Sequence, residues 1–397
     1  MSGETARQAI VIGAGIGGTT AAVALERTGW QVEVYERSPE LGEVGAAVSI
    51  APNAAKALRV LGLEPALKRA SCALDGLEAL QRGGRRITRI PGRQLESRYG
   101  AGLYNLHRAE LHRLLVAGLV TTSVNTGYRA VRVGTEGARA VASFEGPAGV
   151  VTREADLVVV ADGVGSRLRQ ALFPSYVGPT YAGYTVWRGL TSADTAARLD
   201  IPARLSETWG AGARFGHAPI GDGRGYWYAF ENAEPGIEHD HSPDRLAARF
   251  ADWHSPIPAL ITATADDALL RGDVHYLPEP LPSYVAGRVA ILGDAAHAVT
   301  PDIGQGACLA IEDAVVLADE LARAEVLDAL LSYDAARRPR TQQLALQSGK
   351  LGRMLMNPSR VAAGFRDVAA TVLPASLTMR SIANIYAWTP PELVAVG

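Results

Sequence analysis

The sequence predicts an α/β protein in which a parallel sheet flanked by helices is interleaved with an antiparallel sheet, followed by a helical C-terminal segment. Three observations support this fold class. Residues 7–36 read as strand, glycine loop, helix and strand, the unit from which parallel sheets are built. Residues 181–263 change to short alternating runs rich in aromatic residues, which is typical of antiparallel strands. Residues 328–397 show helical patterns interrupted by Pro339, Pro358 and Pro374.

Length and composition narrow the class of protein. A chain of 397 residues is longer than one typical domain, so we expect two intimately joined domains. Apolar residues make up 48% and charged residues 20%, as in globular proteins, and the net charge of −2 gives no reason to expect nucleic acid. No run of about 20 apolar residues is present to span a membrane. The first apolar run opens a glycine loop in place of a cleavage site. We therefore expect a cytoplasmic protein.

Hydrophobic periodicity predicts the elements in order. The first unit comprises a buried strand over 7–12, a helix over 19–28 that stops at Gly29, and a strand over 31–36. The patterns then predict a helix over 52–61, a hairpin over 74–90 that turns at Gly83-Gly84, a helix over 109–119, a meander through 131–133 and 141–144, and a buried strand over 157–161. Later segments predict a helix over 244–253 inside the aromatic region, a buried strand over 289–292 that returns to the first domain, and a long helix over 307–323.

Cysteine and histidine spacings give no metal site. Cys72 and Cys308 are the only cysteines, and they form no CxxC pair or ligand set. His239 and His241 form an HxH, but without a nearby cysteine this pattern favours an exposed loop over a metal site. We expect neither a disulfide nor a bound metal.

A glycine motif joins the first strand to the first helix. Residues 13–18 read GAGIGG, which satisfies GxGxxG, and Glu36 ends the next strand at the distance that this fingerprint requires. Gly13 permits the tight turn, Gly15 lets the backbone approach a pyrophosphate, and Gly18 lets the helix pack on the strand. The helix N-terminus would favour phosphate charge, and Glu36 would accept hydrogen bonds from ribose hydroxyls. The alternative is a purely structural turn. The motif predicts a dinucleotide without separating NAD from FAD.

A second motif favours FAD. Gly293-Asp294 follows the strand over 289–292, at the edge where ligands bind in open α/β sheets. The Asp294 carboxylate can accept hydrogen bonds from ribitol hydroxyls. Gly304 and Gly306 remove side chains where a flat ring must lie close to the backbone, and the following helix N-terminus would stabilise negative charge on a reduced flavin. The alternative is an ordinary strand–loop–helix connection.

With a third motif, these residues resemble a known family. Residues 161–167 (ADGVGSR) contain an Asp-Gly pair between the other two motifs, and the chain is similar over nearly its whole length to the class A flavoprotein aromatic hydroxylases, the para-hydroxybenzoate hydroxylase-like family. Cys308 departs from the family, which often has Asn there, and we interpret it as a packing residue. The cofactor contacts that the resemblance implies are Glu36 and Arg37 at the adenosine, Arg108 at the pyrophosphate, Ala47 and Val48 beside the flavin, and Asp162 in the motif tied to FAD and pyridine-nucleotide use.

The resemblance also implies how the chain divides. We expect a discontinuous FAD-binding domain over 1–73, 101–176 and 277–340. We expect a substrate-binding β-sheet domain over 74–100 and 177–276, and a C-terminal helical segment over 341–397.

Within the family, residues 181–189 and 300–306 most resemble the branch that acts on small rings, with salicylate-, 6-hydroxynicotinate- and urate-type hydroxylases. This places Arg214 and Tyr226 where the urate hydroxylase has a substrate-contacting Arg and Tyr, and it adds Trp187 and Pro301 as candidate substrate contacts. The alternatives are that Tyr226 is a core aromatic residue and Arg214 a solvated surface charge. His217 and Tyr226 are the candidate bases, with a bound water as the alternative. His297 is expected to pack beneath the flavin loop.

The implied activity is that of an FAD-dependent monooxygenase. NADH or NADPH would reduce the flavin, O₂ would add to give a C4a-hydroperoxide, and the distal oxygen would hydroxylate an aromatic or heteroaromatic small molecule. Because a second GxGxxG is absent, NAD(P)H would bind transiently. We expect a monomer or homodimer, with no nucleic-acid partner and no integral association with a membrane.

Several alternatives share the fold and cofactor. An epoxidase or Baeyer–Villiger enzyme acting on a larger natural product, a flavin-dependent reductase, and a non-catalytic flavoprotein all stay open. A flavin-dependent halogenase is disfavoured because its Trp-x-Trp-x-Ile-Pro segment is absent and the three lysines lie in or beside predicted helices.

Overall fold

The glycine motif belongs to a largely parallel, six-stranded sheet. The structure, a computed structural model, describes residues 6–42, 45–236, 243–373, 379–380 and 382–393. The strand order is β18-β19-β12-β1-β2-β8, and β1 pairs in parallel with both β12 and β2. The strands are β1 (Gln8–Ile12), β2 (Gln31–Glu36), β8 (Ser123–Thr126), β12 (Leu157–Val160), β18 (Val285–Ala286) and β19 (Val289–Ile291).

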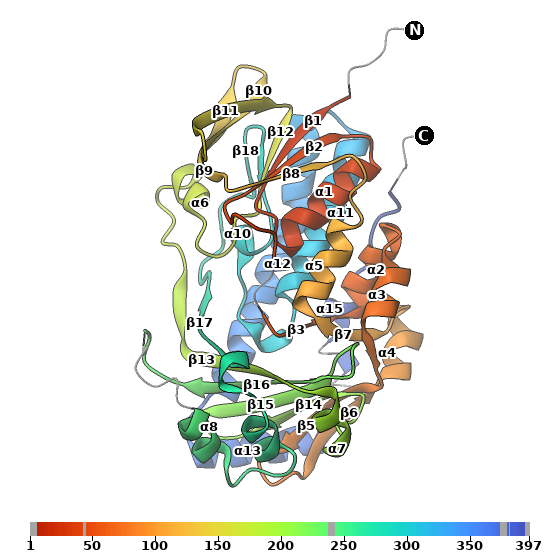
Figure 1. Cartoon of the computed structure of the whole chain (residues 1–397), viewed down its shortest axis with the longest axis vertical. Helices are drawn as coiled ribbons and strands as arrows, with labels where there is room; N and C mark the ends of the chain where they lie inside the picture. Colours follow the sequence, from red (N-terminus) through yellow and green to blue (C-terminus); the bar gives the residue numbers. More distant parts are fainter. Residues whose placement is uncertain (1–5, 43–44, 237–242, 374–378, 381, 394–397) are drawn as a thin grey trace.

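Long helices cover this sheet (Figure 1). Helix α1 (Ile16–Arg27) packs against α11 (Gly306–Arg323), which in turn packs against α2 (Pro52–Val60) and α12 (Val326–Leu355). The strands and helices bury one continuous apolar core. A core closed on both faces explains why the strands of this sheet read as nearly continuous apolar runs.

A second sheet of seven strands lies at the other end of the molecule (Figure 1). Its order is β17-β13-β16-β15-β14-β5-β6, antiparallel except where β14 pairs in parallel with β5. The strands are β5 (Gly76–Gln81), β6 (Arg86–Pro91), β13 (Thr180–Thr191), β14 (Leu205–Trp209), β15 (Ala213–Pro219), β16 (Gly225–Asn232) and β17 (Leu270–Tyr276).

The two faces of this sheet have different neighbours. Because side chains alternate along a strand, residues opposite each other on paired strands share a face. Trp187, Phe215 and Trp227 share the back face, where they pack on α8 (Pro243–Phe250) and α9 (Ile257–Thr262). The front face carries Tyr184, Arg188, Arg214, Tyr226 and Tyr228, and it faces the six-stranded sheet through the contacts described below.

Two three-stranded sheets and several short helices complete the fold. The sheet β3-β7-β4 joins the two large sheets, and the meander β9-β10-β11 extends the first domain. Their strands are β3 (Ala47–Ile50), β4 (Cys72–Leu74), β7 (Leu103–His107), β9 (Arg129–Glu136), β10 (Arg139–Gly146) and β11 (Gly149–Ala155). The remaining helices are α3 (Glu64–Ala70), α4 (Gly92–Tyr99), α5 (Arg108–Val116), α6 (Arg167–Leu172), α7 (Ala193–Arg198), α10 (Asp294–His297), α13 (Arg360–Val372) and α15 (Ala383–Tyr386), with 3₁₀ turns η1 (Asp266–Ala268) and η2 (Pro301–Ile303).

One sequence expectation about the C-terminal region is wrong. Helix α12 runs through Pro339 without a break, so the expected boundary between residues 340 and 341 falls inside a helix. Pro339 lies on the exposed side, while Tyr333, Arg337 and Leu344 are buried on the other side. Tertiary packing therefore holds the helix despite the hydrogen bond that proline removes. The expected break at Pro358 is present between α12 and α13, and Pro374 lies outside the described residues.

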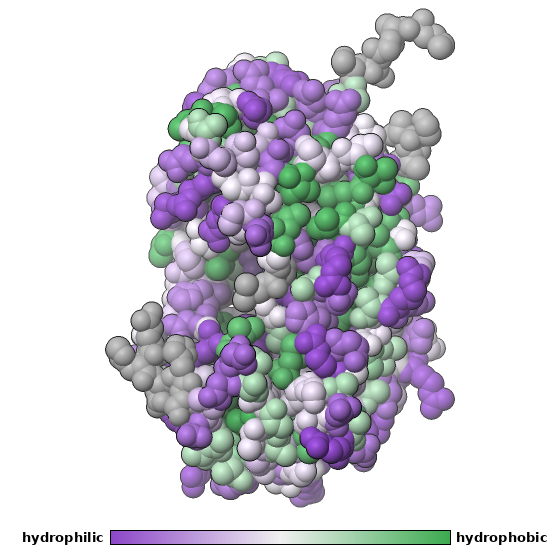
Figure 2. Space-filling model, in the orientation of Figure 1, coloured by the Kyte–Doolittle hydropathy of each residue, from purple (hydrophilic) through white to green (hydrophobic). Residues whose placement is uncertain are grey.

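The surface of the first domain is mixed. In the view of Figure 2, polar residues predominate, and apolar residues gather over α1 and α5. Among the residues that the structure describes, no helix combines the length and apolarity needed to cross a membrane.

Candidate active site

The glycine loop has the close packing that its sequence predicts. Gly13 has a φ of +99°, and a Cβ there would lie 2.4 Å from the Ala161 carbonyl oxygen. A Cβ on Gly18 would lie 1.9 Å from the carbonyl oxygen of Gly13. Gly15 precedes the first turn of α1 as its N-cap. No other residue fits at 13 or 18, and the loop presents the start of α1 to any phosphate above it.

The acidic residue after β2 closes this loop. The Glu36 carboxylate accepts hydrogen bonds from the backbone N–H groups of Ala14 and Ser38, both at 2.8 Å. Glu36 is half-buried, and the neighbouring Arg37 is exposed. Arg108, at the start of α5, passes within 2.8 Å of the place where a Gly45 Cβ would lie. Glu36 therefore borders the glycine loop, and Arg108 borders the segment before β3.

Asp162, two residues after the end of β12, is a half-buried acid with one unpaired carboxylate oxygen. One of its carboxylate oxygens has no hydrogen-bond partner within the described chain. Burial raises the pKa of Asp162, although Ser166 and two arginines oppose the shift. Nearby, the buried Arg169 donates to the carbonyl oxygens of Ala295 (2.9 Å) and Val164 (2.8 Å), which ties the Asp-Gly motif to α10. A bound hydroxyl or phosphate-linked water would satisfy the free oxygen.

The late Gly-Asp motif has the geometry expected of a flavin cradle. Asp294 is exposed at the first position of α10, just beyond β19. Gly304 has a φ of +63°, and Gly306 begins α11. A Cβ on Gly306 would approach the Asp294 carboxylate to 3.8 Å, so the carboxylate and the α11 N-terminus border one space. An exposed acceptor, bare backbone and helix N-terminus together fit the ribityl and ring portions of FAD.

A buried ionic network supports this cradle from below. Asp313 accepts from Gly293 N (3.0 Å), from His297 Nε2 (2.5 Å) and from Arg337 Nε (2.7 Å). Although burial opposes the shift, His297 and Arg337 lower the pKa of Asp313 below its ordinary range. Glu312 pairs with both Arg337 and Arg340 at 2.7–2.8 Å. His297 is therefore bonded through Nε2 within the support of the loop.

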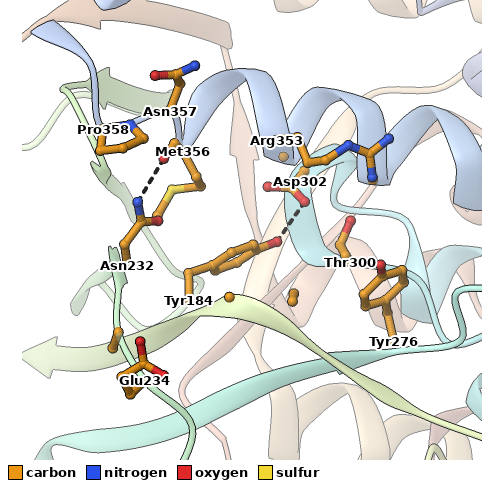
Figure 3. Close-up of a pocket in the computed structure, with 15 residues that line it drawn as sticks. Tyr184, Asn232, Glu234, Tyr276, Thr300, Asp302, Arg353, Met356, Asn357 and Pro358 are labelled. Atoms are coloured by element: carbon orange, nitrogen blue, oxygen red, sulfur yellow. Dashed lines mark hydrogen bonds between the residues drawn. The ribbon is translucent and has the colours of Figure 1, made fainter.

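A second buried arginine lies on the front face of the seven-stranded sheet. Arg214 is fully buried and pairs with Glu207 on β14 (3.2 Å) and with Asp302 in η2. Although burial opposes it, both carboxylates raise the pKa of the guanidinium. Tyr184 donates to Asp302 Oδ2 at 2.7 Å, as Figure 3 shows, and Tyr228 donates to Glu207 at 2.6 Å. The sequence alternative of a solvated Arg214 is therefore wrong.

Tyr226 lies where this face meets β3. It is buried in an apolar cluster with Ala46 and Ile220, and Ala47 and Leu190 pack against the cluster. Its hydroxyl is hydrogen-bonded to the half-buried Arg188, and burial raises the pKa of the phenol. A phenol with a raised pKa is a hydrogen-bond donor at neutral pH and a poor base. Tyr226 is thus a core aromatic residue that also borders the segment expected beside the flavin.

Two candidate residues lie on the wrong face. Trp187 packs in the back cluster and donates to Glu231 at 2.9 Å. His217, paired with Trp227 across the strands, also points to the back, where burial lowers its pKa to about 4. Arg188 follows Trp187 directly, and Arg214 lies three positions before His217. Both take front positions because an odd-numbered shift along a strand reverses the face. The structure therefore does not place Trp187 or His217 at the site.

Other sequence candidates are placed as follows. Pro301 begins η2 beside the paired Asp302. The Cys308 thiol is buried and donates to Ser49 O at 3.6 Å, and burial raises its pKa to about 12, as expected for a packing residue. His239 and His241 lie outside the described residues. Within the described ranges no group of three or more potential metal ligands is present. The sequence patterns did not indicate a role for Arg169. They included Arg188 and Asp302 only as members of motifs, without a role of their own.

Comparison with known proteins agrees with this geometry. A family model described as an FAD binding domain matches residues 6–196 and 279–348. The chain is 38% identical to an aurachin C monooxygenase/isomerase of Stigmatella aurantiaca, covering 88% of this chain and 90% of that protein. It is 35% identical to an FAD-dependent urate hydroxylase of Klebsiella pneumoniae, covering 86% and 89% respectively. The crystal structure of Klebsiella pneumoniae HpxO with FAD and uric acid superposes with a TM-score of 0.89 at 31% identity, covering 97% of each chain.

Proposed function

Because the chain belongs to the FAD-binding monooxygenase family, we propose that it hydroxylates a flat aromatic or heteroaromatic ring held between β3 and the front face of the seven-stranded sheet. The protein is an FAD-dependent monooxygenase of the aromatic hydroxylase class. The observation that carries the finer proposal is the position of Tyr226, which lies in one cluster with Ala46 and Ala47 and whose hydroxyl is hydrogen-bonded to Arg188.

We propose that the cofactor is held by the residues that the glycine and acidic motifs supply. FAD, reduced by NADH or NADPH, would supply the activation of O₂. The unpartnered oxygen of Asp162, the exposed Asp294 and the glycines at 304 and 306 support this placement. The proposed cofactor-binding residues are Gly13, Gly15, Gly18, Glu36, Arg37, Ala47, Val48, Arg108, Asp162, Asp294, Gly304 and Gly306.

The front face favours a substrate with an acidic ring hydroxyl or ring N–H. The Arg188 guanidinium supplies positive charge beside the Tyr226 hydroxyl, and both groups donate hydrogen bonds. Donors stabilise the deprotonated ring, which is the electron-rich form that accepts oxygen. Arg214 is occupied by two carboxylates, so we propose that it positions the 301–304 loop beside the ring. Because neither candidate side-chain base suits the role, a bound water is the favoured base.

A larger substrate is the second candidate. The relative named aurachin C monooxygenase/isomerase is 38% identical to this chain, whereas the urate hydroxylase is 35% identical. We therefore keep a natural-product tailoring reaction, including epoxidation, beside simple ring hydroxylation.

A substrate panel tests the proposal. NADH and NADPH oxidation in air is measured with urate, 6-hydroxynicotinate, 3-amino-4-hydroxybenzoate and aurachin C, and products are analysed by mass. The proposal expects one ring class to accelerate oxidation and to gain one oxygen atom. Flavin-bound protein that is reduced at the same rate with every compound, and that forms no oxygenated product, would count against it.

A variant tests the site itself. Tyr226→Phe removes one donor from the ring-binding face, and we expect kcat/KM to fall about tenfold, or ~1.4 kcal/mol, with normal flavin content. Tyr181→Phe is the matched control, since the Tyr181 hydroxyl donates to the Ala233 carbonyl. Equal activity of the two variants would remove Tyr226 from the proposed site.

A further inference from the structure

A large cavity lies next to the cluster of Arg214, Asp302 and Tyr184 on the front face of the seven-stranded sheet. It has a volume of about 740 Å³ and is bounded by the ends of β13 and β16, the 300–302 loop and the last turns of α12 (Figure 3). Binding sites for small molecules typically measure about 300–1,000 Å³. None of the proposed cofactor or ring contacts lines this cavity. Its size and position therefore suit a separate ligand.

The cavity shares one side chain with the candidate active site. Asp302 lines the cavity, and its carboxylate pairs with Arg214 through one oxygen and accepts from Tyr184 through the other. Helix α12 approaches the same carboxylate so closely that a Cβ on Gly352 would lie 2.3 Å from Asp302 Oδ2. A ligand in the cavity would thus contact the wall that holds the 301–304 loop in place.

The lining favours a carboxylate attached to a ring. Within the described residues, the Arg353 guanidinium at the cavity has no hydrogen-bond or ion-pair partner, so it is available to an anion. The buried Asp302 carboxylate is already paired with Arg214 and accepts a hydrogen bond from Tyr184, and Glu234 lies on the side of the cavity away from Arg353 (Figure 3). Tyr184, Tyr276, Met356 and Pro358 supply rings and apolar groups to the wall, and Asn232, Thr300 and Asn357 supply neutral polar groups.

We propose that this cavity is a second ligand site, which takes an aromatic or heteroaromatic carboxylate with its anionic group on Arg353 and acts on the active site through Asp302. The ligand binds without being oxidised. Asp302, and with it Arg214, would shift between two positions. The ligand shifts this equilibrium only by the difference in its affinity for the two positions. The effect on turnover rests on the proposed hydroxylase function, whereas the binding does not.

The binding test uses the flavin-bound protein and 2-naphthoate in calorimetric titrations. Arg353→Gln should weaken one binding event about tenfold or more, the scale of a lost charge-assisted contact. Lys350→Gln is the matched control, because Lys350 is exposed on the same helix and does not line the cavity. Equal affinity in wild type and Arg353→Gln, or no binding of the probe, overturns the proposal.

A second pair of variants, at Gly349, tests whether filling the cavity prevents binding while the Arg353 charge is kept. A Cβ on Gly349 would meet only Arg353 Nη1, at 3.6 Å, so larger residues fit there by entering the cavity. Gly349→Leu should abolish the binding event that Arg353→Gln weakens, whereas Gly349→Ala should retain it. Both replacements favour the helix over glycine, so unfolding temperatures should not fall. Undiminished binding in Gly349→Leu would also overturn the proposal.

Steady-state kinetics with and without 2-naphthoate test whether binding in the cavity affects turnover. Saturating 2-naphthoate should change the kcat or KM of the wild type and leave Arg353→Gln unchanged. If no substrate is found, the titrations still decide the binding site. Failure of the hydroxylase proposal is thereby distinguished from failure of this one.

Discussion

Two buried arginines each pair with two carboxylates, one in the helical layer of the first domain and one on the seven-stranded sheet. Arg337 pairs with Glu312 and Asp313, and Arg214 pairs with Glu207 and Asp302. Around Arg337 the charges balance, because Arg340 contributes a second cation to the same pair of acids. Around Arg214 two carboxylates share one guanidinium, and tyrosine hydroxyls supply the missing donors.

The Arg337 cluster is also more deeply buried than the Arg214 cluster, and its acids come from fewer elements. The acids of the Arg337 cluster are fully buried on one helix, α11. The acids of the Arg214 cluster come from a strand and a separate loop, and Glu207 keeps 20% of its side chain exposed. Closed and balanced charges are suited to holding a structure, whereas a cluster with surplus negative charge beside a cavity can respond to what binds there. The comparison predicts that breaking the first cluster costs stability and breaking the second costs activity.

The largest effect should come from Asp313→Asn. The substitution removes the buried negative charge that Arg337 and His297 share, and it replaces one acceptor oxygen by an NH₂ group that cannot accept, which costs about 3–5 kcal/mol of unfolding free energy. Urea unfolding of the flavin-bound and flavin-free protein measures it. Asp319→Asn is the control on the same helix, since its partner Arg323 is 56% exposed, and it should cost about 1 kcal/mol or less. Similar losses in both variants would contradict the assignment of Asp313 to the support.

Next in size, Arg214→Gln should reduce kcat/KM about 100-fold, or ~2.7 kcal/mol, in protein that still folds and retains flavin. Asp302 then loses its partner, so the 301–304 loop no longer has one position beside the ring. Steady-state kinetics and the flavin spectrum measure the change. Arg204→Gln, which removes a partner of Glu78 on the same sheet, should leave kcat/KM nearly unchanged. Full activity in Arg214→Gln would erase the distinction between the clusters.

The smallest effect concerns the back face of the same sheet. His217 has its pKa lowered from about 6.5 to about 4 by burial, helped by His254 and Arg204. The unfolded chain therefore binds this proton more readily than the folded chain. Stability should be unaffected above pH ~6.5 and should fall, by on the order of 2–3 kcal/mol, as the pH drops to ~4.

Thermal unfolding against pH tests this sign. His217→Phe should reduce the acid sensitivity, and the exposed His275→Gln should not. The pH dependence of kcat/KM should be the same in wild type and His217→Phe. A displaced activity profile would return His217 to the list of candidate bases.

Short-range patterns predicted the cofactor half of this molecule well. A Cβ on Gly18 would meet the backbone of Gly13 inside the same motif, and a Cβ on Gly13 would meet Ala161 at the end of the adjacent strand. The GxGxxG pattern indicates both close contacts, although the second one is distant in sequence. The ring-binding half depended on distant partners. Asp302 finds Arg214 across 88 residues of chain, and no local pattern indicates this pairing. The choice of Trp187 over Arg188 failed for a related reason, because a one-residue error along a strand exchanges its faces.

The continuity of helix α12 has a practical consequence for protein engineering. Its 30 residues form a rod about 45 Å long, at about 1.5 Å per residue. The turns around Arg337 and Arg340 hold the flavin-side network, while the turns from Gly349 to Met356 line the cavity. The residues that support the cofactor side and the residues that line the cavity therefore lie on separate turns of one helix. A library confined to the last two turns could therefore explore new ligand preferences while leaving the cofactor scaffold intact.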